Sequence, residues 1–308
     1  MPTQGMGMMA GNNRGLLPGA FKMKPLKRAF PLRSPFLYWT IILFILIANF
    51  SVADAQSAER DTSLADLWID MRIGPPLVDL FNETARPEDI ARIDRPEQIH
   101  QLAGITTGRK LVVFRSIAEM EQYLPQMASE FDIVGYNVER GGPTPAAEQA
   151  DLLASVRQVR ELVDQYGLEL AVGPDQNYAV ANGVELAPYA DIFVLQIQRQ
   201  QTNPPLVADY VSSLAPNLRA ANPDLQISVQ VRTEGDVREI IALLDSLMGH
   251  LDGVSILTSP DTVGIAEDLV ARLRPAVNWP LMILLAVILV VVLVGAIFII
   301  RRRRLQSS

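Results

Sequence analysis

The chain has 308 residues, a net charge of −7, two histidines and no cysteine. The lack of cysteine excludes disulfides, thiolate metal sites and thiol nucleophiles, and two histidines make a catalytic triad or a multi-histidine site unexpected. We therefore expect neither a metal nor a cofactor. All 34 acidic residues fall between positions 54 and 279, with only 17 of the 27 basic ones. This stretch carries a net charge of about −17, so nucleic acid is not an expected partner.

The N-terminal region reads as a targeting segment. Residues 1–22 are rich in Met and Gly, and we expect a disordered extension that translation from Met23 would omit. Residues 23–55 combine lysines and arginines, an apolar run at 36–50 and small residues at the cleavage positions, which is the order of a secretory signal peptide. This predicts a mature start near Gln56, and an uncleaved membrane anchor is the alternative.

The C-terminal region predicts a membrane span. Residues 281–300 run from Leu281 to Ile300 without a charged side chain. A helix of this length spans about 30 Å, which matches the hydrocarbon core of a bilayer. Four arginines follow directly, and the positive-inside rule places them in the cytoplasm. We expect a linker and transmembrane helix at 276–300, a cytoplasmic tail at 301–308, and a single-pass cell-membrane protein whose domain faces outward, with the lipid bilayer as partner.

Alternating strands and helices are predicted between these ends. The predicted strands are 110–114, 132–138, 168–172, 191–197, 226–231 and 253–257, with a further one at 67–72. The predicted helices are 117–129, 146–166, 178–187, 206–221, 234–248 and 263–273, with one or two short ones at 74–104. Consecutive βα units imply a parallel sheet with right-handed crossovers. We take 106–275 as the (β/α) repeat core and 56–105 as the N-terminal part of the same domain.

Two architectures fit this α/β pattern: a compact or incomplete TIM-like (β/α) barrel, and a doubly wound open sheet. Strands inside a doubly wound sheet are apolar on both faces. Here polar residues alternate toward the strand ends, as at Asn137 with Glu139 and at Gln196 with Gln198. This alternation favours a barrel with a polar mouth.

In a barrel, the pocket is formed by residues at or just after the carboxyl ends of the strands. Those residues are Arg115, Asn137, Glu139, Arg140, Asp175, Gln196, Gln198, Arg199, Gln230, Arg232, Glu234, Thr258 and Ser259. Amides, carboxylates and guanidinium groups recognise hydroxyl-rich ligands. The sequence therefore predicts that the domain binds a saccharide-like or other polar ligand at the cell envelope, with a glycan or an envelope protein as partner.

Catalysis is the alternative reading of the same positions. Glu139 is a candidate general acid or base, since a sheltered carboxyl can have a raised pKa. Glycoside hydrolysis needs a second carboxyl about 5–10 Å away, for which Asp175 and Glu234 are the candidates. An ion pair of Glu139 with Arg140 or Arg232 would instead favour a structural role. A glycosidase-like hydrolase and a structural or protein-interaction domain thus remain alternatives to ligand binding.

Three blocks of sequence resemble a group of uncharacterised secreted bacterial proteins. The blocks are VGYNVE at 134–139, TPAAEQ at 144–149 and YADIFVLQIQ at 189–198. The group is similar to glycoside-hydrolase-type TIM barrels, and the resemblance covers about 110–275. It implies a barrel with a saccharide-like pocket around Tyr136, Glu139, Gln196 and Gln198. The chain departs from the group at Asn137, where an aspartate is usual, and the resemblance then leaves Glu139 without a neighbouring acid.

Overall fold

The computed structural model describes residues 63–274 and, further along, 287, 289, 290, 292, 293, 295 and 296. The predicted N-terminal extension and signal peptide lie outside the described residues. So does most of the predicted span at 281–300, where the few described positions are helical. Among the described residues, no helix is both long and apolar enough to cross a membrane.

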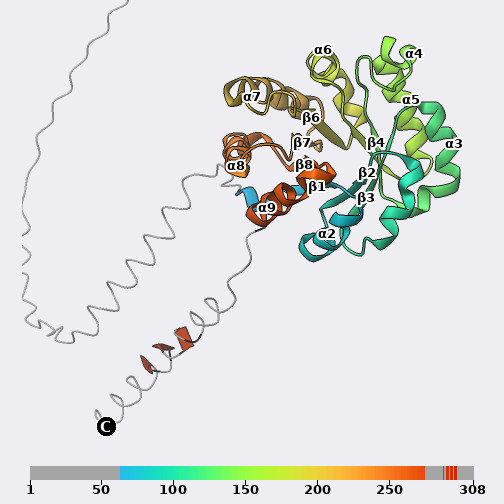
Figure 1. The fold of residues 1–308 in the computed structure, drawn as a ribbon. Helices are drawn as coiled ribbons and strands as arrows, with labels where there is room; N and C mark the ends of the chain where they lie inside the picture. Colours follow the sequence, from blue (N-terminus) through green and yellow to red (C-terminus); the bar gives the residue numbers. More distant parts are fainter. Residues whose placement is uncertain (1–62, 275–286, 288, 291, 294, 297–308) are drawn as a thin grey trace, which may run out of the picture. The chain divides into compact units, whose positions relative to one another are not determined.

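Eight parallel strands close into a barrel in the described part of the chain (Figure 1). They are β1 (Trp68–Arg72), β2 (Ile90–Ile93), β3 (Arg109–Phe114), β4 (Ile133–Tyr136), β5 (Glu169–Val172), β6 (Ile192–Gln196), β7 (Gln226–Arg232) and β8 (Gly253–Leu257). Each strand pairs with its neighbours in sequence, and β1 also pairs with β8. This closure confirms the predicted TIM-like barrel and excludes the doubly wound open sheet.

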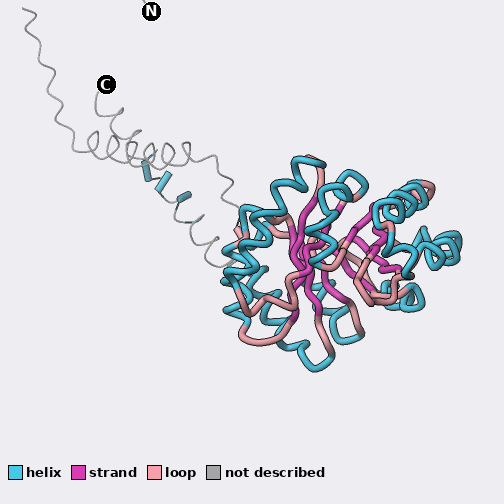
Figure 2. The backbone as a smooth tube through the Cα atoms, turned by 90° about the horizontal axis from the view of Figure 1, so that it is seen from above, coloured by secondary structure: helices cyan, strands magenta, loops and turns pink. Residues whose placement is uncertain are grey.

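Helices surround the strands on the outside of the barrel (Figure 2). They are α2 (Val78–Thr84), α3 (Ile117–Met127), α4 (Ala146–Ala150), α5 (Leu152–Asp164), α6 (Gln176–Leu186), α7 (Pro204–Ala221), α8 (Val237–Ser246) and α9 (Val263–Leu273). The helix predicted at 146–166 is wrong as one element, since it divides into α4 and α5 at Asp151. There the backbone leaves the helical region, with φ −131° and ψ 78°, and the Asp151 carboxylate accepts the amide of Ala154 at 3.1 Å and caps α5.

Strand β2 was not among the predicted strands, and it is the element that completes the barrel between β1 and β3. Only four residues long, it contains Arg92 and is flanked by Pro87 and Pro96. Such a run reads as a loop. The short helices expected in the same region are present as α2 and as the 3-10 helices Pro75–Leu77 and Pro96–Gly104.

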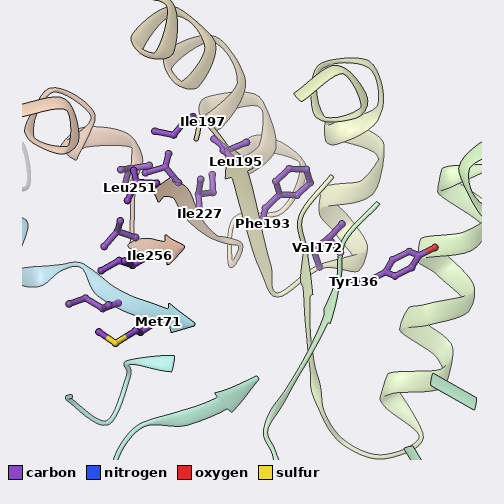
Figure 3. Close-up of a cluster of buried hydrophobic side chains, with 14 of the residues drawn as sticks. Met71, Tyr136, Val172, Phe193, Leu195, Ile197, Ile227, Leu251 and Ile256 are labelled. Carbon is purple, nitrogen blue, oxygen red and sulfur yellow. The ribbon is translucent and has the colours of Figure 1, made fainter. Parts of the chain in front are cut away.

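Side chains alternate between the barrel interior and the layer under the helices. The outward set is apolar and packs against the helices (Figure 3). The inward set includes an apolar plug of Trp68, Ile90, Leu111, Val113, Ile133, Ala171 and Ile192. The indole of Trp68 lies against Gly253, where any Cβ atom would collide with the ring. The plug closes the barrel from below and leaves its carboxyl end for polar residues.

A fourfold repeat organises the amino end of the barrel. An aspartate precedes each even-numbered strand, and its carboxylate accepts the amide of the second residue of the preceding odd strand. The pairs are Asp89 with Ile69, Asp132 with Lys110, Asp191 with Leu170, and Asp252 with Ile227, at 2.7 to 2.8 Å. The strands are therefore locked in register two by two around the barrel.

Arginines bind three of these four aspartates from helices or helix ends. Arg274 lies 2.6 Å from Asp89, Arg160 lies 2.7 Å from Asp191, and Arg219 lies 2.8 Å from Asp252. The first pair is the most buried, with side chains only 7% and 2% exposed. Arg274 also donates to the carbonyl of Leu67 at 2.9 Å, so it joins the end of α9 to the residue before β1.

Candidate functional site

A cavity of about 310 Å³ opens at the carboxyl end of the barrel. Seven of the eight strands contribute to its wall, either directly or through the loop that follows the strand, and β5 does not. The lining residues are Arg72, Arg92, Asp94, Arg95, Val113, Phe114, Arg115, Asn137, Glu139, Pro143, Gln198, Arg199, Gln230, Arg232 and Leu257. We call this cavity the mouth. Because Val113 belongs to both the lining and the apolar plug, the plug forms the base of the mouth.

The mouth brings together many of the residues that the sequence pointed to. Those that line it are Arg115, Asn137, Glu139, Gln198, Arg199, Gln230 and Arg232. Gln196 is buried beside them and reaches them through hydrogen bonds. The other predicted residues, namely Tyr136, Arg140, Asp175, Glu234, Thr258 and Ser259, do not line this cavity.

Tyr136 lies on the opposite face of β4 from the mouth. Strand alternation sends its neighbours Gly135 and Asn137 inward and Tyr136 outward, into the apolar layer under the helices (Figure 3). Its hydroxyl donates to the carboxylate of Glu148 at 2.7 Å. Burial, together with this carboxylate, raises the pKa of the Tyr136 hydroxyl. Tyr136 therefore supports the wall of the barrel.

The carboxylates of Asp175 and Glu234 make their contacts outside the mouth. The Asp175 carboxylate accepts the backbone amides of Asn177 at 2.9 Å and Tyr178 at 3.0 Å, which makes it the N-cap of α6. It also accepts the amide of Arg140 at 2.8 Å. Glu234 is exposed and lies 3.8 Å from the guanidinium of Arg232. Neither carboxyl shares the mouth with Glu139.

A chain of side-chain amides leads to Glu139. Gln198 donates to the amide oxygen of Gln196 at 3.1 Å, and Gln196 donates to Glu139 at 3.4 Å and to the carbonyl of Gly173 at 2.9 Å. The buried amide oxygen of Gln198 has no partner among the described residues. None of the ion pairs in the described domain includes Glu139, since Arg232 approaches Glu234 and Arg140 lies over the Tyr178 ring at 5.2 Å.

A charged network at the base of the mouth was missed by sequence reasoning. The Arg92 Nε donates to both oxygens of Asp70 at 3.0 Å, and its Nη1 donates to Asp94 at 2.6 Å. Arg72 binds the other oxygen of Asp94 at 2.8 Å, and the Ser255 hydroxyl donates to Asp70 at 2.7 Å. Arg92 and Asp94 were missed because β2 was not recognised as a strand, whereas Asp70, Arg72 and Ser255 lie on predicted strands and were not selected.

Burial and the neighbouring charges shift the pKa values of Asp70 and Arg92. Burial raises the pKa of the Asp70 carboxyl, although Arg92 and Ser255 oppose the shift. For Arg92, burial lowers the pKa, but the carboxylates of Asp70 and Asp94 outweigh it and hold the pKa above its usual value. Arg92 is therefore a permanent positive charge under the mouth. Its Nη2 is buried and has no partner among the described residues.

The remaining arginines of the mouth have no acidic partner. The described residues form no ion pair with the guanidinium groups of Arg95, Arg115 or Arg199. In all, six arginines line the mouth against two carboxylates, Asp94 and Glu139. Among the described residues, no three acids or histidines gather as metal ligands. The chemistry of the mouth is thus that of hydrogen bonding and positive charge.

A second cavity of about 240 Å³ shares Arg72 with the mouth. It lies between the loop after β1 and the loop after β8, and it contains Thr258 and Ser259. Its buried Gln101 Oε1 and Thr258 Oγ1 have no partner in the described domain. The two predicted hydroxyl residues are therefore placed beside the mouth, on the far side of Arg72.

No family model matches the chain, and no curated protein does either. Among solved structures it is similar to 3-keto-L-gulonate-6-phosphate decarboxylase from Vibrio cholerae, at 11% identity over 68% of this chain and 100% of that one, with a TM-score of 0.44. For β-methylaspartase from Clostridium tetanomorphum the identity is 10%, over 69% and 59% of the two chains, with a TM-score of 0.48.

A third similar structure is phospho-2-dehydro-3-deoxyheptonate aldolase from Thermotoga maritima, at 12% identity over 47% of this chain and a TM-score of 0.33. The chain covers only 40% of the length of that aldolase. At these identities and TM-scores, the likeness assigns no activity.

Proposed function

We propose that the mouth of the barrel binds a polar, saccharide-like ligand, and that segment 281–300 tethers the barrel to the outer face of the cell membrane. The observation that supports ligand binding is a polar cavity whose lining contains two buried groups without a hydrogen-bond partner in the described part of the chain. These are the amide oxygen of Gln198 and the Nη2 of Arg92.

Unpartnered buried groups favour a ligand that satisfies them. Leaving such a group without a hydrogen bond costs about 1–3 kcal/mol, and a sugar hydroxyl can both donate to Gln198 Oε1 and accept from Arg92 Nη2. Gln230 and Asn137 add further donors and acceptors around the same space. The volume of about 310 Å³ lies at the lower end of the usual range for ligand pockets, which suits a small ligand.

Binding is favoured over glycoside hydrolysis by the state of the acids. Hydrolysis ordinarily requires two carboxyl groups that face one ligand. The second acid in the mouth is Asp94, and its two oxygens are held by Arg72 and Arg92. Glu139 is therefore the one lining carboxylate without an arginine partner among the described residues. Its carboxylate is available to accept hydrogen bonds from the hydroxyl groups of a sugar.

Replacing Gln198 by leucine is expected to weaken saccharide binding about 10-fold, since one hydrogen-bonding amide is lost from the buried wall. Calorimetry on the full chain, in a nonionic detergent without a sugar head group, would measure this against a panel of charged and neutral mono- and oligosaccharides. Gln126→Leu is the matched control, because Gln126 is exposed on α3 outside the mouth. Failure of every sugar to bind, or equal binding by both variants, would count against the proposal.

The tethering proposal predicts that the barrel and the C-terminal tail at 301–308 lie on opposite sides of the membrane. The chain has no cysteine, so single substitutions give clean labelling sites. A membrane-impermeant maleimide should label Ser212→Cys, on the exposed side of α7, in intact cells, and should label Ser307→Cys only after permeabilisation. Labelling of both sites in intact cells, or of neither, would contradict the proposed topology.

A further inference from the structure

Resting on the proposed function, we infer that the ligand is anionic: a saccharide with a carboxylate or phosphate group whose oxygens are bound by Arg92, Arg115 and Arg199. The inference concerns the class of ligand, which the amides of the mouth leave open because they suit neutral and charged sugars alike.

The distribution of charge in the domain is the first argument. Between positions 54 and 279 there are 34 acidic and 17 basic residues. Within the described residues 63–274 there are 16 basic and 31 acidic residues, and six of these basic residues line the mouth, whereas two of these acids do. Asp70 under Arg92 adds a third acid, and an excess of arginine remains. A strongly acidic domain has thus gathered positive charge in one concave place, where it attracts anions most effectively.

The pairing of arginines is the second argument. Outside the mouth the buried and half-buried arginines have acidic partners, as Arg109 has Glu169 at 2.8 Å and Arg219 has Asp252 at 2.8 Å. Arg115 is half-buried after β3 and has no such partner in the described domain. Arg199, exposed after β6, has none either. Internal charge balance accounts for Arg72 and Arg92, but it does not account for the half-buried Arg115. The contrast does not extend to Arg199, since the exposed Arg157 and Arg272 outside the mouth also form no ion pair among the described residues.

The third argument is that hydrogen bonds fix the orientation of the Arg92 side chain. Its side chain is only 6% exposed, and the bonds from Nε to Asp70 and from Nη1 to Asp94 fix the plane of the guanidinium group. The remaining Nη2 is then a rigid, charged donor at the base of the mouth. Charge-assisted hydrogen bonds from a fixed guanidinium are well suited to carboxylate and phosphate oxygens.

Paired probes test the charge of the ligand. The full chain in sugar-free nonionic detergent would be titrated with galacturonate against galactose, with glucose 6-phosphate against glucose, and with inorganic phosphate alone. We expect at least one charged sugar to bind about 10-fold or more tightly than its neutral counterpart, and more weakly at high salt. The uronate and phosphate arms distinguish an acidic glycan from a phosphorylated sugar.

Variants assign the binding to the mouth. Arg115→Gln combined with Arg199→Gln should weaken charged-sugar binding about 10- to 100-fold and should reduce the difference in affinity between a charged sugar and its neutral counterpart. Arg238→Gln is the matched control, since Arg238 is exposed on α8 and bonded to Asp236 at 2.9 Å outside the mouth.

The outcomes separate the two proposals. Equal affinity for charged and neutral sugars would overturn the anionic ligand and leave saccharide binding intact. Binding of inorganic phosphate alone, lost in the Arg115 and Arg199 variant, would support an anion site and overturn the saccharide. Absence of binding by every probe would overturn both.

Discussion

Replacing Arg92 by methionine is expected to lower the free energy of unfolding by about 3–5 kcal/mol, since it leaves a buried carboxylate without its counter-charge. Asp70 would lose its two hydrogen bonds from Arg92 and would retain the one from the Ser255 hydroxyl, at 2.7 Å. Chemical denaturation of the full chain, followed by circular dichroism, would measure the loss.

The cost of Arg92→Met is expected to depend on pH. Burial already raises the pKa of Asp70 while Arg92 opposes it, so without Arg92 the folded-state pKa rises further. A group whose pKa is raised on folding stabilises the protein below its unfolded pKa, about 3.9 for aspartate, and this stabilisation is lost as pH rises through the folded pKa. The variant should therefore approach the parent protein in stability as the solution is made acidic.

Two further variants identify the cause. Arg72→Met removes an arginine that also binds Asp94, but its side chain is 40% exposed, so the expected cost is about 0–1 kcal/mol. Asp70→Leu combined with Arg92→Met removes both buried charges and should recover much of the lost stability. If Arg72→Met and Arg92→Met lower the free energy of unfolding equally, burial of the Arg92–Asp70 pair is not the cause of the loss.

The outcome at Arg92 also shows where sequence reasoning reached its limit. Strands β3 to β8 each contain a run of apolar residues that periodicity detects, and the predicted mouth residues follow those strands. Strand β2 is short and carries a charge in its middle, so periodicity gives no signal there. The mouth residues Arg92, Asp94 and Arg95 were missed with it, because they lie on β2 or in the loop after it. Arg72 ends the predicted strand 67–72 and was left out of the predicted site although the same rule applies to it.

The wrong assignment of Tyr136 to the pocket has a different cause, because the alternation of side chains along the strand already predicts that Tyr136 points away from the pocket. The same period of two that puts Asn137 and Glu139 on the inner side puts Tyr136 on the outer side. Its assignment to the pocket came from the resemblance of 134–139 to a family. Side-chain direction was the better guide at this position.

Replacing Asp89 by alanine is expected to cost about 3–5 kcal/mol of stability, as large an effect as that of Arg92 but at the opposite end of the barrel. The change leaves Arg274, only 7% exposed, without its carboxylate, and leaves the amides of Ile69 and Arg86 without the acceptor they reach at 2.7 and 2.8 Å. Denaturant unfolding of the full chain would measure the loss, with ligand binding by the folded protein as a second readout.

The fourfold repeat supplies the matched control for this prediction. Asp132 occupies the equivalent position before β4 and accepts the amide of Lys110 at 2.8 Å, but it is exposed and has no arginine partner among the described residues. Asp132→Ala should therefore cost about 1 kcal/mol. Similar losses at both positions would show that the amide bond, rather than the buried arginine, carries the energy. A large loss confined to Asp89→Ala, with sugar affinity unchanged in the folded fraction, would assign the amino end of the barrel to stability and the mouth to recognition, as is usual for this architecture.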